Sequence, residues 1–539
     1  TVMPSSEGPL FLGIDLSTQQ LKAVVVDSEC VVVCREAVNF ERDFPVFRTK
    51  DGVCREGQAA WSPVQLWLAA FDSVIEKLSA SVELSRIAAI SGTAQMHGTV
   101  YWCKEGEEKL AAMSNTQDVG TSFYDDLMCG FARDECPIWM DSSTGEYVDK
   151  FDRAIPNLNE VSGSTAYHRF SGPQIAKIYK EEREVYDNTS RISLVSSFAA
   201  SLLLGRVAPI DLTDACGMNI LDIRKQDWSD RCLEVVVDYE GEDAVKGLRT
   251  RLGVPIPANT ILGTVNKFLV AKHGFSPDCK IVSFTGDNMS SMADLNVVSG
   301  DVVLSLGTSD TVNFLTESFI PRPFGHLLIH PTTANSFLTL ICYKNGSLTR
   351  ERIRKSIGVE WEGIGQLLLQ TDAGNGGHIG IFLDMDEIEP RVPAGDYRWD
   401  PEGRPLSQPF PPAVEARALL EGQVLHLRSN TPTHLTRVIV TGGASNNCAI
   451  CQVIADVFGL PVFKAALAES ATLGGAKRAK YAFETPSVSY AEYFNGYSTL
   501  ELVAKPNPAA TAVYVDMLQL YEQREQELVK AVEKAIHKN

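Results

Sequence analysis

The chain has 539 residues, of which 44% are hydrophobic, and a formal net charge of −19. A single hydrophobic core stops growing at about 250–300 residues, so this length predicts two globular domains of similar size. The negative charge, unrelieved by any Lys/Arg-rich run, argues against binding to nucleic acid or to an anionic membrane surface, and no apolar run reaches the ~20 residues needed to cross a bilayer.

The first predicted elements are two strands joined by a polar turn. Leu10–Ile14 and Leu21–Asp27 are largely apolar, and Asp15–Gln20 lies between them. A tight turn points backbone N–H groups and hydroxyls into one small space, which suits an anion, and a carboxylate at the end of a strand suits Mg²⁺. The alternative is an ordinary polar hairpin, since Ser, Thr and Asp are common turn residues.

Strands and helices alternate after this turn, which indicates an α/β domain. A third strand is predicted at Val31–Cys34, and the apolar spacing in Ser62–Lys77 predicts a helix. Ile87–Ile90 is typical of a buried strand, and it leads into a segment that contains His97. The ends of strands are where α/β folds gather ligand sites, although a lone histidine is more often a satisfied core or surface residue.

The same plan recurs near the middle of the chain. Val302–Leu306 and Val312–Leu315 are largely apolar, and the turn Gly307–Thr311 between them carries hydroxyls. Two such turns, one in each domain, could hold a polyphosphate from opposite sides, and a duplicated plan fits two related domains. We place the boundary near Thr285, which gives domains 8–285 and 286–539.

One carboxylate, Asp287, lies beside this boundary. It follows a predicted strand at Lys280–Phe284. A carboxylate at the end of a strand near a domain junction is well placed to accept a hydroxyl proton. The alternative is a turn aspartate that bonds to its own backbone.

Glycines end a later predicted strand, Arg437–Val440. Gly442 and Gly443 leave room for a flat group, such as a base or a ribose, against the backbone. A helix is expected from Asn447 to Phe458, and both Asn446 and Asn447 could contact that group or cap the helix.

The remaining sequence features concern cysteines, a loop and the last helix. Among 12 scattered cysteines, Cys448 and Cys451 have CxxC spacing, but no second pair or ligand-spaced histidines lie nearby. We interpret both as buried helical thiols. Reduced thiols, together with an N-terminal segment that does not resemble a signal peptide, predict a cytoplasmic protein. Asp384–Pro412, rich in Pro, Gly and charge, is predicted to be loop, and Tyr514–Lys538 an outer helix.

The motifs in this order resemble the FGGY family of carbohydrate kinases. No P-loop and no protein-kinase glycine loop is present, so ATP would be bound by other devices. The resemblance runs from Leu10 to about Tyr521. It rests on the segments Ile14–Gln20, Pro137–Ser143, Gln174–Tyr179, Arg191–Leu202, Phe284–Asn288 and Leu306–Thr311.

The resemblance implies an α/β fold of two ribonuclease H-like domains, as in actin and hexokinase, which flank a central cleft. Within the family, the chain is most similar to eukaryotic members that act on D-xylulose, although Met96 stands where those members usually have Gln. The implied reaction is transfer of phosphate from ATP, with Mg²⁺, to the C5 hydroxyl of D-xylulose. The implied partners are a sugar and a nucleotide, and both a monomer and a homodimer stay open.

The resemblance also carries roles for individual residues. Asp287 is expected as the general base and Asp15 as the magnesium ligand. The sugar contacts are expected to be Met96, His97, Arg169, Asp287 and Asn288. The ATP contacts are expected to be Asp15, Thr18, Gln19, Thr308, Trp361, Gly442, Gly443 and either Asn446 or Asn447.

Three other functions remain open from the sequence. One is a kinase of the same family that acts on another pentulose or a polyol, such as ribulose or glycerol. Another is a non-catalytic, actin-like ATPase or binding protein, which would leave Asp287 and His97 unexplained. The third is an inactive sugar-binding relative, against which Asp15, Thr308 and Asp287 argue. The role of Gly374–Gly377, as ligand contact or plain turn, is also open.

Overall fold

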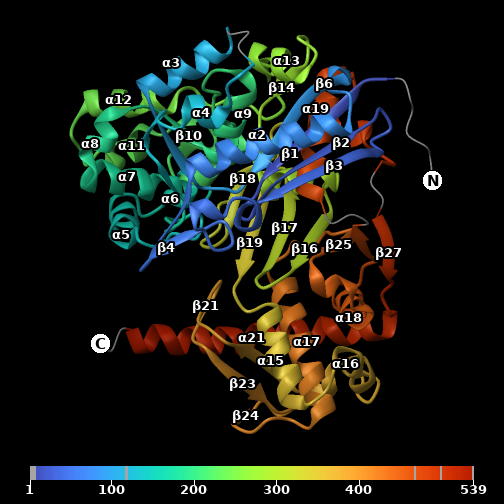
Figure 1. The fold of residues 1–539 in the computed structure, drawn as a ribbon. Coiled ribbons are helices and arrows are strands. Elements are labelled where there is room, and N and C mark those ends of the chain that lie inside the picture. Colours follow the sequence, from blue (N-terminus) through green and yellow to red (C-terminus); the bar gives the residue numbers. More distant parts are fainter. Residues whose placement is uncertain (1–7, 116–118, 466–468, 498–499, 537–539) are drawn as a thin grey trace.

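Two seven-stranded sheets, one from each half of the chain, form the framework of the computed structural model (Figure 1). The structure describes residues 8–115, 119–465, 469–497 and 500–536. The first sheet has the order β13-β14-β6-β1-β2-β3, with β15 paired to β6. Its strands are β1 Leu10–Leu16, β2 Gln20–Val26, β3 Val32–Asn39, β6 Ile87–Ala94, β13 Ile261–Thr264, β14 Lys280–Val282 and β15 Thr285–Gly286.

The second sheet repeats the plan of the first. Its order is β18-β19-β17-β16-β25-β26-β27. In both sheets the leading strand has an antiparallel neighbour on one side and a parallel neighbour on the other: β1 lies between β2 and β6, and β16 between β17 and β25. The strands are β16 Asp301–Leu306, β17 Asp310–Thr316, β18 His326–Ile329, β19 Phe337–Tyr343, β25 Arg437–Thr441, β26 Val462–Ala465 and β27 Leu500–Ala504. The predicted α/β fold with a duplicated plan is confirmed.

Helices cover both sheets. The longer helices that flank the sheets or the site are α2 Val64–Ser81, α7 Ser171–Glu181, α9 Val195–Leu204, α14 Asp287–Asp294, α15 Ser347–Ile357, α16 Trp361–Leu368, α17 Pro412–Ser429, α18 Cys448–Phe458, α19 Ser470–Glu484 and α21 Pro508–Ile536. All seven residues of β1 are buried because layers of helix lie on both faces of its sheet. This explains the continuous apolar run from which the strand was predicted.

Helix α19 comes from late in the chain but packs on the first sheet, where it lies red among blue strands in Figure 1. A Cβ at Gly13 would lie 2.0 Å from the carbonyl oxygen of Thr472, so strand and helix backbones touch. The helix also packs on α14, and Arg478 is fully buried, donating to the carbonyl oxygens of Ser283 and Gly92. The boundary at 285/286 stays a prediction, since α19 joins both halves.

Two predictions from sequence are corrected by the structure. The segment Asp384–Pro412 is not all loop: it contains β21 Glu387–Ile388, β22 Arg391–Val392, β23 Gly395–Trp399 and β24 Pro405–Leu406. Strands of two to five residues are too short for a periodic pattern to stand out. Both CxxC thiols are helical, but only Cys451 is buried, because Cys448 starts α18 and is exposed.

The last predicted helix, Tyr514–Lys538, ends outside the described part of the chain. The last helix is confirmed as α21, which begins earlier than predicted, at Pro508. Residues 1–7 and 537–539 lie outside the described ranges. Among the residues described, none of the helices has the length and apolar character needed to span a membrane.

Candidate active site

The first polar turn, residues 17–19, joins β1 to β2 and is closed by a hydrogen bond from Ser17 N to Gln20 O at 3.0 Å. Asp15 precedes it, near the end of β1, and is buried. Its Oδ2 accepts from Ser17 Oγ at 2.6 Å and lies 3.5 Å from Lys22 Nζ. Its Oδ1 is buried without a partner, and burial raises the pKa of Asp15. A buried carboxylate oxygen that has no hydrogen-bond partner is a suitable ligand for a hard cation such as Mg²⁺.

Side chains from two other segments brace this turn. Thr18 Oγ1 donates to Gln95 Oε1 at 3.3 Å and accepts from Trp139 Nε1 at 3.0 Å. Gln19 has an exposed side chain, and its carbonyl accepts from Phe40 N. Gln95 and Trp139 were not predicted as site residues. Both lie in or beside motifs already recognised, which was the signal that could have found them.

Asp287 is the first residue of α14 and is half-buried. Its Oδ1 accepts from the backbone N–H of Asn288 at 2.7 Å. Burial, and next the negative charge of Asp15, raise the pKa of Asp287 to about 7. Asn288 Oδ1 is buried without a partner. The carboxyl groups of Asp15, in β1, and Asp287, at the start of α14, thus lie close enough to influence each other's charge.

Met96 and His97 lie beside this carboxyl pair. A Cβ at Gly286 would be only 2.6 Å from Met96 Cγ, so Met96 packs against the residue before Asp287. The Nδ1 of His97 lies 2.9 Å from the carbonyl oxygen of Gly217. A carbonyl only accepts, so Nδ1 carries the proton and Nε2 is an acceptor. Burial and the nearby Arg169 lower the pKa of His97 to about 3, which keeps the ring neutral.

Arg169 completes the group in the first half of the chain. Its Nη2 lies 3.1 Å from Nε2 of His326, and its guanidinium lies 5.0 Å from the ring centre of Tyr167. Its Nε is buried without a partner. Contacts thus link Met96 to Gly286, the residue before Asp287, and His97 to Phe170, the residue after Arg169. A common sugar site for Met96, His97, Arg169, Asp287 and Asn288 stays a prediction. His326 was not predicted, since nothing in its local sequence marks it.

The second polar turn, residues 307–309, joins β16 to β17 and leaves Thr308 exposed. Gly307 O accepts from Ser347 N at 2.8 Å, at the start of α15. The strand order puts this turn beside the end of β25, where Gly442 has a φ of 83° and a Cβ would lie 2.5 Å from Leu306 O. The residue after it, Gly443, has open space where a Cβ would be.

The two asparagines at the start of α18 have different surroundings. Asn447 is the helix cap, and its Oδ1 accepts from Ala449 N at 2.9 Å and from Ile450 N at 3.2 Å. Asn446 is exposed, and its Oδ1 accepts from Lys464 Nζ at 2.5 Å. The oxygen of Asn447 is thus committed to capping. The side-chain amide of Asn446 also donates to Gly443 O at 3.1 Å, but Asn446 is exposed, so we keep it as the candidate for a ligand contact. Lys464 was not predicted.

Trp361 and the glycine segment 374–377 lie elsewhere in the second half. Trp361 begins α16, whose other residues contact α18, and its ring lies 5.8 Å from the guanidinium of Arg354. Gly374 N donates to Glu421 Oε1 at 3.0 Å, and a Cβ on Gly374 would lie 2.4 Å from Val513 Cγ1. The glycine segment therefore serves the close packing of α17 and α21.

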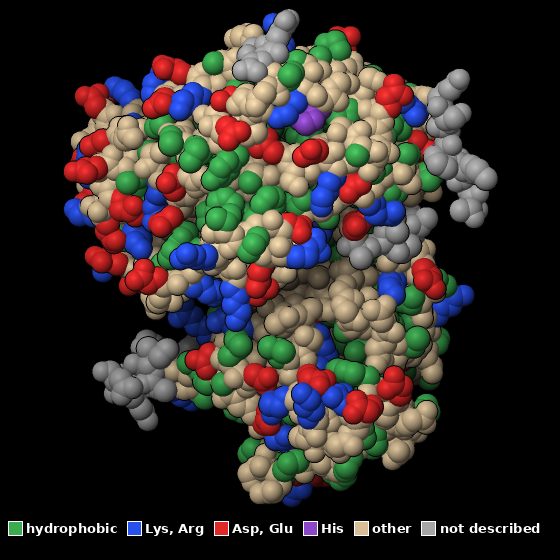
Figure 2. Space-filling model, in the orientation of Figure 1, with side chains coloured by type: hydrophobic (Ala, Val, Ile, Leu, Met, Phe, Trp, Pro, Cys, Tyr) green, Lys and Arg blue, Asp and Glu red, His purple; other side chains and the backbone are tan. Residues whose placement is uncertain are grey.

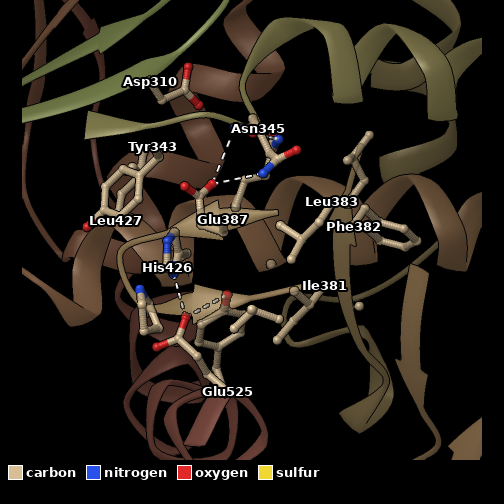
Figure 3. Close-up of a pocket in the computed structure, with 17 residues that line it drawn as sticks. Asp310, Tyr343, Asn345, Ile381, Phe382, Leu383, Glu387, His426, Leu427 and Glu525 are labelled. Atoms are coloured by element: carbon tan, nitrogen blue, oxygen red, sulfur yellow. Dashed lines mark hydrogen bonds and ion pairs between the residues drawn. The ribbon is translucent and has the colours of Figure 1, made fainter. Parts of the chain in front are cut away.

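A cavity of about 40 Å³ lies in the second half, away from the residues above (Figure 3). Its lining includes Tyr343, Glu387, His426 and Glu525. It approaches the second turn through Asp310 and through Asn345, the neighbour of Gly346, but none of the predicted sugar or ATP contacts lines it. Figure 2 shows the surface hollowed between the upper and lower halves of the molecule. Because none of the predicted contacts lines the cavity of Figure 3, we take the residues around the two turns, and not this cavity, as the candidate site.

Comparison with known proteins identifies the protein family. The chain matches both domains of the FGGY family of carbohydrate kinases, the N-terminal domain over residues 10–124 and 134–293 and the C-terminal domain over residues 302–483. The chain belongs to the FGGY family of carbohydrate kinases.

Three of the similar proteins are named xylulose kinases. The chain is 39% identical over 532 residues to xylulose kinase of Rattus norvegicus, covering 96% of this chain and 97% of the rat protein. It is 40% identical over 497 residues to xylulose kinase 2 of Arabidopsis thaliana, covering 88% and 87%. The crystal structure of xylulose kinase from Rhodospirillum rubrum shares the fold, with a TM-score of 0.79, 15% identity and coverage of 96% of this chain and 99% of that one.

Proposed function

We propose that this protein transfers the γ-phosphoryl group of ATP to the C5 hydroxyl of D-xylulose, with Asp287 as the general base. The activity is supported by relatives named xylulose kinases, which match nearly the whole chain. The choice of base rests on one observation: a half-buried carboxyl at the start of α14 whose pKa is raised to about 7, beside Asp15. A general base works best when its pKa lies near the working pH.

The sugar would lie against His97, Arg169 and Asn288, over Met96. The acceptor Nε2 of neutral His97 suits a sugar hydroxyl, and the unpartnered Nε of Arg169 is a free donor. Xylulose is uncharged, so Arg169 would act as a hydrogen-bond donor. The buried oxygen of Asn288 adds a second acceptor.

Phosphoryl transfer leaves the protein mainly the tasks of positioning and charge stabilisation. Asp287 would take the C5 proton as the new bond to phosphorus forms. Mg²⁺, when bound through Asp15, offsets the charge on the phosphate oxygens. Within the described residues no cluster of three or more His, Cys, Asp or Glu could hold a metal.

ATP would lie in the second half of the chain. Thr308 and the amides of its turn would contact the phosphates, and Thr18 with Gln19 would face them from the first turn. Gly442 and Gly443 would lie beside the base or ribose, next to Asn446 and Trp361. Closure of the two halves would exclude water, which otherwise competes as acceptor.

The other readings of the sequence are less well supported. The matches to both domains of a carbohydrate kinase family favour an enzyme over an actin-like binding protein. We also propose a cytoplasmic location, supported by the free state of all cysteines. Monomer and homodimer remain alternatives.

The test is Asp287→Asn, assayed by ADP release over a panel of pentuloses and polyols. Asn keeps the size of Asp and can still bond a hydroxyl, but it takes no proton near neutrality. We expect unchanged melting and xylulose binding, with turnover reduced about 10²–10⁴-fold. Turnover within a few-fold of wild type in a folded, sugar-binding variant would refute the assignment, and wild-type preference for another sugar would refute the substrate.

A further inference from the structure

A histidine from the second half of the chain contacts Arg169, one of the proposed sugar contacts. His326 is the first residue of β18 and is 4% exposed. Its Nε2 lies 3.1 Å from Arg169 Nη2, and its Nδ1 lies 3.1 Å from Ser164 Oγ. Ser164 and His326 also form a β-bridge across the two halves.

The protonation state of His326 follows from these partners. An arginine side chain only donates hydrogen bonds, so Nε2 must be the acceptor. The ring is then neutral, with its proton on Nδ1 and donated to Ser164 Oγ. Burial and the charge of Arg169 hold the pKa of His326 well below its ordinary value. Both ring nitrogens are therefore committed, one to each partner.

The segment 167–170, which carries Arg169, is held by the second half at further points. Phe170 packs between the rings of His97 and His326, with centroid separations of 4.5 Å and 5.0 Å. Tyr167 Oη donates to Glu389 Oε1 at 3.3 Å, and the same oxygen accepts from Gly325 N at 3.0 Å. Residues of the second half thus contact the segment both before Arg169, at Tyr167, and after it, at Phe170.

Glu389 is also a competitor for Arg169. Its Oε2 is buried without a partner, and the charge of Arg169 lowers its pKa while burial, the larger effect, raises it. A guanidinium released from His326 has this carboxylate within its field. Pairing with Glu389 would engage guanidinium N–H groups that the proposed sugar contact needs.

We propose that His326 is a positioning residue: its Nε2 fixes Arg169 so that the remaining guanidinium N–H groups face the sugar. The inference rests on the proposed role of Arg169 as a sugar contact. Preorganisation matters here because a flexible arginine loses rotamer freedom on binding, and a contact already held in place loses less. Sugar affinity is thereby set in part by a side chain from the other half of the chain.

Two substitutions separate the contacts of His326. His326→Asn places an amide near the position of Nδ1, which keeps a donor for Ser164 but removes the acceptor for Arg169. His326→Gln places an amide oxygen near the position of Nε2, which keeps the acceptor. A hydrogen bond to a charged group is worth a factor of about 10–100. We expect His326→Asn to raise KM for xylulose about tenfold, with KM for ATP unchanged, and His326→Gln to restore most of the loss.

The controls distinguish this inference from the site assignment. Arg169→Leu should raise KM for xylulose at least as much as His326→Asn; an unchanged KM would overturn the role of Arg169 and the inference with it. A raised KM in Arg169→Leu with a normal KM in His326→Asn would overturn the positioning role alone. Equal losses in the Asn and Gln variants would also overturn it, since packing and not the acceptor would then matter.

A further variant covers the case in which both His326 variants fold poorly. Ser164→Ala leaves the imidazole in place but removes the acceptor of its Nδ1 proton, so the ring is free to turn. We expect a smaller rise in KM for xylulose, in the same direction, with melting near that of wild type. An unchanged KM in that variant counts against the proposal.

Discussion

Asp310 and Arg350 form a buried, two-pronged ion pair directly behind the turn that carries Thr308. Arg350 Nη1 donates to Asp310 Oδ2 at 2.6 Å and Nη2 to Oδ1 at 2.9 Å, and each side chain is only 3% exposed. Asp310 begins β17, and Arg350 lies on α15. The pair therefore fixes the far end of the turn proposed to bind phosphate.

Removing one partner should be costly. Arg350→Met leaves the Asp310 carboxylate buried without its counter-charge, and such a loss typically costs about 3–5 kcal/mol. The matched control is Arg352→Met on the same helix, where the exposed pairs with Asp384 and Asp396 should contribute about 1 kcal/mol or less. Urea unfolding of both variants checks this, and equal losses would contradict the buried role of Arg350.

The sheets could be predicted because their strands are buried on both faces. β1 and β16 show as largely apolar runs, and each is followed by a hydroxyl-bearing turn, so the duplicated plan could be predicted although the letters of the two segments do not repeat. Asp15, near the end of β1, and Asp287, directly after β15, could be named because ligand sites gather at the ends of strands. Their joint position follows from the sheet order, since β15 pairs with β6 and β6 with β1.

The position of α19 and the contact between His326 and Arg169 could not be predicted, because they depend on long-range packing that no local sequence pattern encodes. Helix α19 reaches back to the first sheet and also packs on α14, where the close approach needs Gly474: a Cβ there would lie 1.9 Å from Ser290 O. His326 meets Arg169 only because β18 lies against the loop that contains Ser164. The choice between Asn446 and Asn447 required the start of α18, which sequence reasoning places only to within a few residues.

His97 offers a second test of the sugar site. Its φ of 75° is left-handed, a conformation that Asn tolerates better than most residues. His97→Asn keeps a donor for Gly217 O but loses the acceptor Nε2. We expect KM for xylulose to rise by a factor that corresponds to about 0.5–1.5 kcal/mol, with KM for ATP unchanged. A loss of ATP affinity with normal sugar binding would show that His97 does not belong to the sugar site.

His426 and Glu525 make stability depend on pH. Nδ1 of His426 lies 2.6 Å from Glu525 Oε1, a contact that Figure 3 marks with a dashed line. The carboxylates of Glu525, Glu387 and Asp310 raise the pKa of His426 although burial, the largest single effect, lowers it. With a folded pKa above the unfolded value of about 6.5, protonated His426 stabilises the fold below that pH, and the contribution is lost as pH rises through the folded pKa.

Urea midpoints at about pH 6 and pH 8.5, on either side of the ordinary histidine pKa, measure this effect. Wild type should lose more stability between them than His426→Gln does, and Glu525→Gln should remove the same difference. The groups facing the ring include Tyr343 and Tyr521 as well as the three carboxylates. An identical pH dependence in wild type and His426→Gln would show that the ion pair does not couple to folding.

The two glycines after β25 separate folding from nucleotide binding. Gly442 has a positive φ, and a Cβ there would meet Leu306 O at 2.5 Å, so Gly442→Ala should destabilise the fold by about 1–3 kcal/mol. Its strain would also shift the end of β16, beside the turn of Thr308. Gly443→Ala adds a methyl group into open space and should melt like wild type.

The proposed position of the nucleotide is tested by the second of these variants. If the base or ribose of ATP lies against Gly443, the added methyl group occupies that space. We then expect KM for ATP to rise several-fold in Gly443→Ala, while KM for xylulose and the melting temperature stay at wild-type values. Because the methyl group meets no protein atom within 4 Å, a change in KM for ATP cannot come from local repacking. A normal KM for ATP in Gly443→Ala would place the nucleotide elsewhere in the cleft.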